Sequence, residues 1–291
     1  MRNGNSVTID GKTRVCGLIG NPVEHTISPD IHNTLANACG INLAYVPFHV
    51  ETGRLEAAVR GAFALNVLGM NVTVPYKKEV LLFLQDADPL AAAMESVNTL
   101  VRTQDGYKGF NTDMSGLFRA MQEDGVSLER EEVIVLGAGG VGRAVAFLCA
   151  MKGASRVYLL NRSVEKARQV AREVNERSGN PCVHAMELKN WRELPDRKYL
   201  CIQATSVGLY PDSDRAAVEE EAFYEKIHTG YDLIYRPSKT KFMSLTEKAG
   251  GKAFNGLKML VYQGVEAFEL WNAVTAPKEA VTQIYEMLAA K

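Results

Sequence analysis

The sequence predicts an α/β fold with largely parallel sheets, and three observations support this expectation. Short apolar runs rich in β-branched residues alternate with stretches of helical periodicity along the chain. A G-x-G-x-x-G pattern at Gly137–Gly142 lies between an apolar run and a helical stretch, which is the setting that dinucleotide binding requires. The 291 residues suffice for two domains of about 150 residues, each with its own core.

The first half of the chain supplies strands and helices in turn. Ser28 followed by Pro29 predicts a helix start, with a hydroxyl at the N-cap and proline at the first helical position, and Gly40 predicts the end of that helix. Pro75 is predicted to open another helix. A Gln-Asp-Gly turn predicts a hairpin. The expected strands are Val15–Ile19, Tyr45–Val50, Met70–Val74, Ser96–Val101 and Tyr107–Phe110, and the expected helices are Ser28–Cys39, Leu55–Leu65, Pro75–Leu84 and Asn111–Asp124.

The second half is organised around the dinucleotide unit. Val133–Leu136 is an expected strand, the glycines form the turn after it, and the following helix reaches Met151. The first glycine permits the tight turn, the second lets the backbone approach a pyrophosphate, and the third lets the helix pack closely on the strand. We expect the cofactor to contact Gly137, Ala138, Gly139, Gly140, Val141 and Gly142. The later expected strands are Arg156–Leu160, Cys182–Ala185, Leu200–Ala204, Tyr231–Tyr235 and Lys252–Phe254, and the later helices run from Arg162 to Arg177 and over Leu188–Leu194, Gly256–Trp271 and Pro277–Ala290.

The residues after the second strand of this unit indicate which dinucleotide binds. An acidic residue there would accept hydrogen bonds from the adenosine 2′-hydroxyl of NAD. Asn161, Arg162, Ser163 and Lys166 stand there instead, and the two cations suit a 2′-phosphate. A solvated helix start would also explain Arg162 and Lys166, but no carboxylate is expected near Arg162, which favours NADP over NAD.

Composition and charge narrow the class of protein. A net charge of -1 gives no electrostatic reason to expect binding to nucleic acid or to an anionic membrane. No stretch approaches the ~20 apolar residues of a membrane span, and the polar first dozen residues lack an apolar signal core. The five cysteines are odd in number and form no C-x-x-C pair, so neither a disulfide framework nor a metal site is expected. We expect a cytoplasmic protein, a monomer or homodimer, with a small-molecule substrate.

Polar groups at strand-to-helix junctions outside the dinucleotide unit are candidates for the chemistry. A nicotinamide enzyme must hold its substrate against the ring and manage one proton. Each candidate has a simpler structural explanation: Lys77 beside Lys78 resembles a surface lysine, and Asp113 and Ser28 are placed like helix N-caps. Their joint occurrence favours a site. The candidates are Thr26, Ser28, Asn71, Thr73, Lys77, Asn98 and Asp113, and Thr205 joins them in a turn at the carboxyl end of a later strand.

Several short motifs follow one another along the chain: Asn21–Val23, His25–Pro29, Asn71–Lys77, Val97–Thr99, Asn111–Asp113, Gly137–Gly142, Asn161–Ser163 and Leu260–Gly264. This set resembles the motifs of the shikimate dehydrogenase family, and the resemblance runs from about Cys16 to Trp271. It implies reversible, NADP-dependent reduction of 3-dehydroshikimate to shikimate in aromatic amino-acid biosynthesis. It also implies a substrate-binding domain at residues 1–113 to which residues 255–291 return, a Rossmann-type domain at residues 114–254, and a cleft between the two.

The resemblance assigns roles to individual residues. Lys77 would be the acid/base at the C3 oxygen of the substrate, and Asp113 would hydrogen-bond the same region. Leu233 and Gly256 would approach the nicotinamide half of NADP. The substrate carboxylate would be held by Thr26, Ser28, Thr73 and Tyr235, ring hydroxyls by Asn98 and Gln263, and Asn71 would also bind the substrate.

Four positions depart from the usual pattern of the family: Thr26 replaces serine, Lys166 replaces arginine, Gln203 replaces asparagine, and Tyr262 stands where small residues also occur. Thr26 keeps the hydroxyl but adds a methyl group, and Lys166 keeps the charge but loses the bidentate fork. One alternative is a quinate/shikimate dehydrogenase of dual specificity. Another is a non-catalytic NADP-binding sensor, which would most simply have lost Lys77 or Asp113. A Rossmann domain of unrelated function would explain only the glycine motif.

Overall fold

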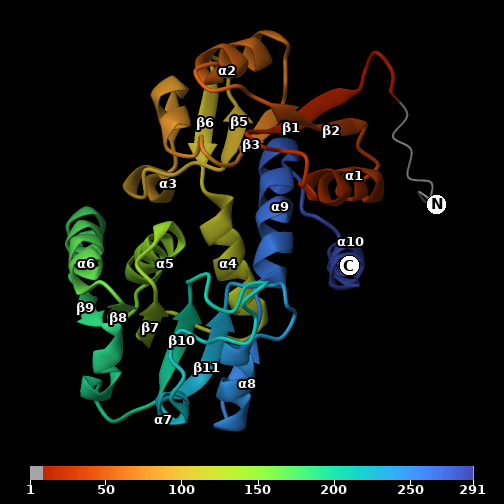
Figure 1. Ribbon diagram of the computed structural model, residues 1–291. Helices are drawn as coiled ribbons and strands as arrows, with labels where there is room; N and C mark the ends of the chain where they lie inside the picture. The colour runs from red at the N-terminus through yellow and green to blue at the C-terminus, as the bar shows by residue number, and fades with distance from the viewer. Residues whose placement is uncertain (1–8, 291) are drawn as a thin grey trace. The chain divides into compact units, whose positions relative to one another are not determined.

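The computed structural model describes residues 9–290, which form two compact units (Figure 1). One unit contains the chain up to Leu117 and from Leu260 onward, and the other contains Phe118–Met259. Each unit is built on a six-stranded sheet with helices against it, so the predicted α/β class is confirmed. Of the polar first dozen residues, the first eight lie outside the described residues.

The sheet of the first unit is mixed. Its strand order is β2-β1-β3-β5-β6-β4. The strands β1, β2 and β3 are mutually parallel where they pair, β5 runs antiparallel to both β3 and β6, and β4 is parallel to β6. The antiparallel pair β5–β6 is the hairpin that the Gln-Asp-Gly turn predicts. The strands are β1 Arg14–Gly20, β2 Leu43–His49, β3 Gly69–Val72, β4 Asp86–Ala87, β5 Thr99–Arg102 and β6 Tyr107–Phe110.

The last part of the chain completes the core of the first unit. Trp271 donates its indole N–H to the carbonyl of Leu100 on β5 at 2.9 Å. Gly69 on β3 makes room for that ring, because a Cβ there would lie 2.1 Å from the indole nitrogen. The helical elements of this unit are α1 Ser28–Ala38, α2 Leu55–Ala64, the 3-10 helix η1 Glu79–Phe83, α3 Pro89–Ala93 and α10 Lys278–Ala289, while α4 Thr112–Glu123 and α9 Leu257–Asn272 each continue into the second unit.

The sheet of the second unit is parallel throughout, with the order β12-β11-β10-β7-β8-β9. The chain first adds strands on one side of β7 and then, from β10, on the other, so the ends of β7 and β10 form the switch point at which such sheets bind ligands. Its strands are β7 Glu132–Leu136, β8 Arg156–Asn161, β9 Val183–Glu187, β10 Tyr199–Gln203, β11 Ile227–Asp232 and β12 Lys252–Phe254. Its helices are α5 Gly140–Met151, α6 Val164–Ser178, the 3-10 helix η2 Leu188–Glu193, α7 Glu221–Tyr224 and α8 Lys241–Lys248.

Two local predictions are wrong. Ser28 is not the N-cap of α1, since Ile27 occupies that position and Ser28 is the first helical residue. The helix expected from Pro75 is a series of turns followed by η1. There the carbonyl of Lys77 accepts a hydrogen bond from the N–H of Val97 at 2.8 Å, so it is engaged outside any helical ladder. None of the helices within residues 9–290 is both long and apolar enough to cross a membrane.

Candidate active site

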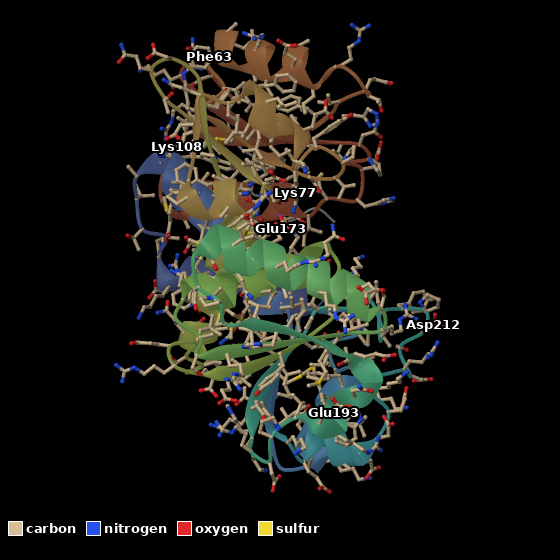
Figure 2. All side chains as sticks on the ribbon, turned by 90° about the vertical axis from the view of Figure 1, so that its left-hand side faces the viewer. Phe63, Lys77, Lys108, Glu173, Glu193 and Asp212 are labelled. Carbon is tan, nitrogen blue, oxygen red and sulfur yellow. The ribbon has the colours of Figure 1, made fainter. Side chains whose placement is uncertain are left out.

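Lys77 and Asp113 form an ion pair in the first unit. The Nζ atom of Lys77 lies 2.7 Å from Oδ2 of Asp113, and the two side chains are 34% and 24% exposed. Lys77 is labelled in Figure 2. Asp113 is available for this pair because Asn111 caps α4 instead, accepting a hydrogen bond from the N–H of Met114 at 3.2 Å. The neighbouring Lys78 is 77% exposed and pairs with a different carboxylate. The structure therefore distinguishes two adjacent lysines that the sequence leaves equivalent.

The hydroxyls of Thr26 and Ser28 are adjacent at the start of α1. Thr26 donates to Oγ of Ser28 at 3.1 Å, and its own Oγ1 accepts from the backbone N–H of Ser28 at 3.2 Å. Both hydroxyls thus lie beside the positive end of the α1 dipole, where an anion is favoured. Thr73 follows β3, and its backbone N–H bonds the carbonyl of Ile19 at 3.0 Å.

The three predicted amide ligands lie on β3, before β5 and on α9. Asn71 donates to the carbonyl of Asn98 at 3.2 Å, so the structure brings these two together. Gln263 donates to the carbonyl of Leu260 in its own helix at 3.0 Å. Gly116 of α4 permits close contact there, because a Cβ on it would lie 2.5 Å from the backbone nitrogen of Gln263.

The glycine turn of the second unit is closely packed at two positions and open at two others. Gly137 has φ +103°, and a Cβ on Gly142 would lie 1.9 Å from the carbonyl oxygen of Gly137, so neither position accepts a side chain. By contrast, a Cβ on Gly139 or Gly140 would meet no described atom within 4 Å. The turn is therefore crowded at Gly137 and Gly142 but has free space at Gly139 and Gly140, where α5 begins. Free space at this position fits an anion bound to the helix N-terminus.

The end of β8 places the predicted adenosine ligands beside this turn. Asn161 accepts a hydrogen bond from the N–H of Ala138 at 3.1 Å, and Ser163 caps α6. Arg162 and Lys166 make no ion pair with any residue in the range 9–290, so both charges are available to an anion. Val141 is 48% exposed at the first turn of α5.

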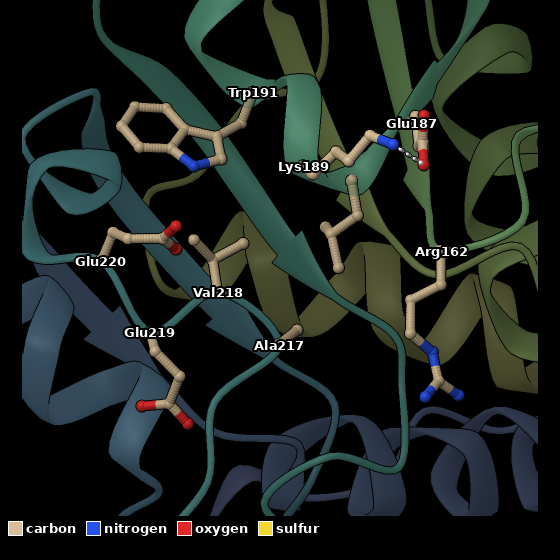
Figure 3. Close-up of a pocket in the computed structure, with 9 residues that line it drawn as sticks. Arg162, Glu187, Lys189, Trp191, Ala217, Val218, Glu219 and Glu220 are labelled. Atoms are coloured by element: carbon tan, nitrogen blue, oxygen red, sulfur yellow. Dashed lines mark ion pairs between the residues drawn. The ribbon is translucent and has the colours of Figure 1, made fainter.

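The expectation that no carboxylate lies near Arg162 is wrong. Glu187 lines the same pocket as Arg162, together with Trp191 and Val218 (Figure 3). It is distant in sequence, but β9 pairs with β8 so that Glu187 stands opposite Asn161. Its carboxylate is bound by Lys189 at 2.9 Å, and the Arg162 guanidinium points away from it in Figure 3. The negative charge is therefore present but paired.

Thr205 lies at the switch point of the second sheet, while Leu233 follows β11 and Gly256 follows β12. A Cβ on Gly137 would lie 2.7 Å from the methyl group of Thr205, and a Cβ on Gly256 would lie 2.3 Å from the carbonyl of Leu233. Gln203, fully buried, accepts from both the N–H and the hydroxyl of Thr205 at 2.7 Å, so glutamine at this unusual position holds the turn. Tyr235 lies beyond β11, 38% exposed, and its role toward a carboxylate stays a prediction.

A buried carboxylate beside these residues makes stability depend on pH. Burial raises the pKa of Asp232 from 3.8 to about 6, against hydrogen bonds from Thr240 and the Ile234 N–H that lower it. The folded chain then binds this proton more tightly than the unfolded chain. We expect the tighter binding of this proton to contribute about 3 kcal/mol to the free energy of unfolding. The contribution is fully present below pH 4 and is lost as the pH rises to about 6.

Urea unfolding from pH 4 to 7 measures this contribution. Asp232→Asn can keep both hydrogen bonds, as acceptor from Ile234 and donor to Thr240, and should flatten the wild-type decline between pH 4 and 6. Parallel stability curves for the two proteins would contradict the assignment.

Sequence reasoning missed residues that act across strands. Glu187, Asp232 and Tyr45 gave no local signal, because their partners come from other elements. Thr99 and Thr112 stood within recognised motifs but received no role. In the described part of the chain, no group of three histidine, cysteine or acidic residues is arranged to hold a metal ion.

Three family models match successive parts of the chain. The model described as Shikimate dehydrogenase substrate binding domain matches residues 18–100. The model described as Shikimate / quinate 5-dehydrogenase matches residues 119–208, and the Shikimate 5'-dehydrogenase C-terminal domain matches residues 256–284.

Individual relatives cover nearly the whole chain. The Shikimate dehydrogenase (NADP(+)) of Desulforamulus reducens is 39% identical over 289 residues, which are 97% of this chain and 98% of the relative. A crystal structure of a shikimate dehydrogenase in complex with NADP+ has a TM-score of 0.85 and 34% identity, and the match covers 98% of each chain. A quinate dehydrogenase from Corynebacterium glutamicum in complex with NAD also has a TM-score of 0.85, at 26% identity over 96% of this chain and 99% of that one.

Proposed function

The chain belongs to the shikimate dehydrogenase family, and from this premise we propose which of its residues bind the substrate, hold the cofactor and move the proton. It is an oxidoreductase, and its reaction is the reversible, NADP-dependent reduction of 3-dehydroshikimate to shikimate in aromatic amino-acid biosynthesis. The observation that carries the assignment of roles is the Lys77–Asp113 pair.

Lys77 is the proton donor in the direction of reduction. Its ammonium group carries the proton that the substrate C3 oxygen gains as that carbon changes from ketone to alcohol, and the amine takes it back in the reverse direction. Asp113 fixes the position of Nζ through the 2.7 Å contact. When bound, NADPH supplies the hydride.

The substrate carboxylate binds at the start of α1. Thr26 and Ser28 supply two adjacent hydroxyls there, and the helix dipole adds a favourable field. Thr73 contributes a third hydroxyl after β3. Asn98 and Gln263 offer amide groups to the ring hydroxyls. Each hydroxyl can donate one hydrogen bond and accept others, so it can bind either end of an amide.

The second unit holds NADP. The fit rests on the open backbone at Gly139 and Gly140, on the Asn161 contact to Ala138, and on two cations without ion-pair partners in the described chain. Arg162 and Lys166 bind the 2′-phosphate. Thr205, Leu233 and Gly256 contact the cofactor closer to its nicotinamide half. Ser163 keeps α6 capped so that Lys166 stays within reach. We take the two units to be the substrate-binding and NADP-binding domains.

Initial rates with shikimate and with quinate, each against NADP and NAD, test the proposed function. We expect the highest kcat/KM for shikimate with NADP. The second candidate, a dual-specificity quinate/shikimate dehydrogenase, is favoured by the extra methyl group of Thr26 and the Glu187 carboxylate near Arg162. Comparable quinate rates would support it, and inactivity with all four pairs would support a binding protein without catalysis.

Arg162→Asp should shift the cofactor preference toward NAD. Loss of one charge-assisted hydrogen bond lowers NADP kcat/KM by roughly ten- to a hundredfold, and the new carboxylate repels the 2′-phosphate further. Arg168→Asp is the matched control, because Arg168 is exposed on α6 and pairs with Glu165. An unchanged NADP/NAD ratio in Arg162→Asp, measured from steady-state rates, would place the selection elsewhere.

We propose a cytoplasmic enzyme that is a monomer or homodimer. The five cysteines are all unpaired, which suits a reducing compartment. Light scattering on the purified chain distinguishes the two oligomeric states.

A further inference from the structure

Three donors converge on one atom of Asn98. The backbone N–H of Thr112 lies 2.7 Å from Oδ1, the hydroxyl of Thr112 lies 3.1 Å from it, and the hydroxyl of Thr99 lies 3.0 Å from it. All three residues are at most 3% exposed. Because a backbone N–H can only donate, the atom that faces it must be the amide oxygen. The side chain of Asn98 therefore has one permitted orientation.

The amide nitrogen of Asn98 consequently points away from these donors. Nδ2 makes no hydrogen bond to any residue that the structure describes. It is not fully enclosed either, so it keeps some accessible surface. It is an N–H₂ group with two donors free for a ligand.

A second amide extends the same arrangement. Asn71 donates from Nδ2 to the carbonyl of Asn98 at 3.2 Å and to Oγ1 of Thr99 at 3.0 Å. A carbonyl can only accept, so the orientation of Asn71 is also determined, and its Oδ1 faces the hydroxyl of Tyr45 at 2.7 Å. Burial raises the pKa of Tyr45 well above its usual value, so the phenol keeps the proton that it donates.

The contacts run in one direction across four elements. Tyr45 on β2 donates to Asn71 on β3, and Asn71 donates to Thr99 on β5. Thr99 donates its single hydroxyl proton to Oδ1 of Asn98, which also accepts from the N–H of Thr112 at the start of α4. Each bond polarises the next, which strengthens such chains in a buried setting. The ring of Tyr45 is stacked on that of His32 with centroids 4.2 Å apart, so the phenol that begins the chain is itself held by packing.

We propose that Tyr45, Thr99 and Thr112 are positioning residues that hold Asn98 with its N–H₂ group toward the substrate, where it donates to a hydroxyl oxygen of the ring. The inference rests on the proposed function for the contact between Asn98 and substrate. It also reassigns Asn71. Both of its amide donors and one lone pair of its oxygen are used within the protein, so it acts on the substrate through Asn98.

The test is steady-state kinetics of Thr112→Val, which removes one donor to Asn98 and keeps the backbone N–H. We expect the KM for shikimate to rise about five- to tenfold, with kcat within twofold of wild type and the KM for NADP unchanged. Thr112→Ser keeps the hydroxyl and should restore the wild-type KM. Tyr45→Phe should raise the same KM by a smaller factor.

Tyr107→Phe is the control for loss of a buried phenol. Tyr107 donates to the carbonyl of Val67 at 2.7 Å in the same sheet and makes no side-chain hydrogen bond to Asn98 in the described chain, so its removal should leave both KM values unchanged. Asn98→Asp is a second, independent variant: one carboxylate oxygen can accept the three inner donors, while the other replaces the outer N–H₂ group by an acceptor, so the KM for shikimate should rise more than in Thr112→Val.

Each outcome bears on the inference. An unchanged KM for shikimate in folded Thr112→Val, or equal effects of Tyr45→Phe and Tyr107→Phe, would overturn it. A parallel fall of kcat and of NADP affinity with thermal stability would reveal a merely structural role and overturn it as well. Inactive wild-type enzyme would instead refute the proposed function, so the two failures are distinguishable.

Discussion

Replacement of Lys77 by methionine is expected to lower kcat by a factor of about 10² to 10⁴, the usual contribution of a positioned acid/base group. Methionine retains most of the side-chain volume but has no proton to give to the C3 oxygen. The Kd for NADPH, measured by fluorescence titration, should stay within twofold of wild type, because the predicted cofactor ligands belong to the other unit of the chain.

Lys78→Met is the matched control for this experiment. Lys78 is the next residue, carries the same charge and has the same length, but it pairs with Glu95 on the exposed surface. We expect its kcat to equal that of wild type. Equal losses in the two variants would mean that general positive charge, rather than proton transfer by Lys77, supports turnover.

Gly139→Ala is expected to raise the Kd for NADP on the order of a hundredfold while leaving the stability of the chain nearly unchanged. The added methyl group meets no described atom within 4 Å, so the protein alone accommodates it. A pyrophosphate bound against this backbone would collide with it. Isothermal titration with NADP and thermal unfolding together separate the two effects.

Gly142→Ala and Gly61→Ala are the comparison variants for this prediction. The Cβ of the first would lie 1.9 Å from the carbonyl of Gly137, so we expect unfolding of the turn and loss of stability as well as binding. Gly61 lies in α2 with open space around it, and alanine there should leave NADP binding unchanged. Tight NADP binding by Gly139→Ala would show that the cofactor does not approach the turn at that residue.

The dinucleotide unit was predictable because its rules are local. The strand, the positions of the three glycines and the helix after them are all determined by residues within 20 positions of one another, and the structure has each of them. The hairpin β5–β6 was predictable for the same reason, since its turn residues lie between the two paired strands.

The failures involve partners that are distant in the sequence. The expected helix after Pro75 is interrupted where the carbonyl of Lys77 bonds Val97, twenty residues later. Glu187 lines the same pocket as Arg162 only because β8 pairs with β9. An N-cap role for Asp113 was locally reasonable, but Asn111 took that role and left the carboxylate to Lys77. Sheet register and competition between neighbouring caps cannot be read from spacing alone.

The contact of Trp271 with the first sheet has a consequence for biosynthesis. The ring fills the space at Gly69 and bonds Leu100, a residue 171 positions earlier in the chain. A ribosome therefore releases all of the second unit, Phe118–Met259, before the first unit has the helix that closes its core. Nascent chains usually fold from the N-terminus onward. In this protein the unit that is begun first is completed after the second, because the carbonyl of Leu100 on β5 lacks its indole partner until Trp271 has been synthesised.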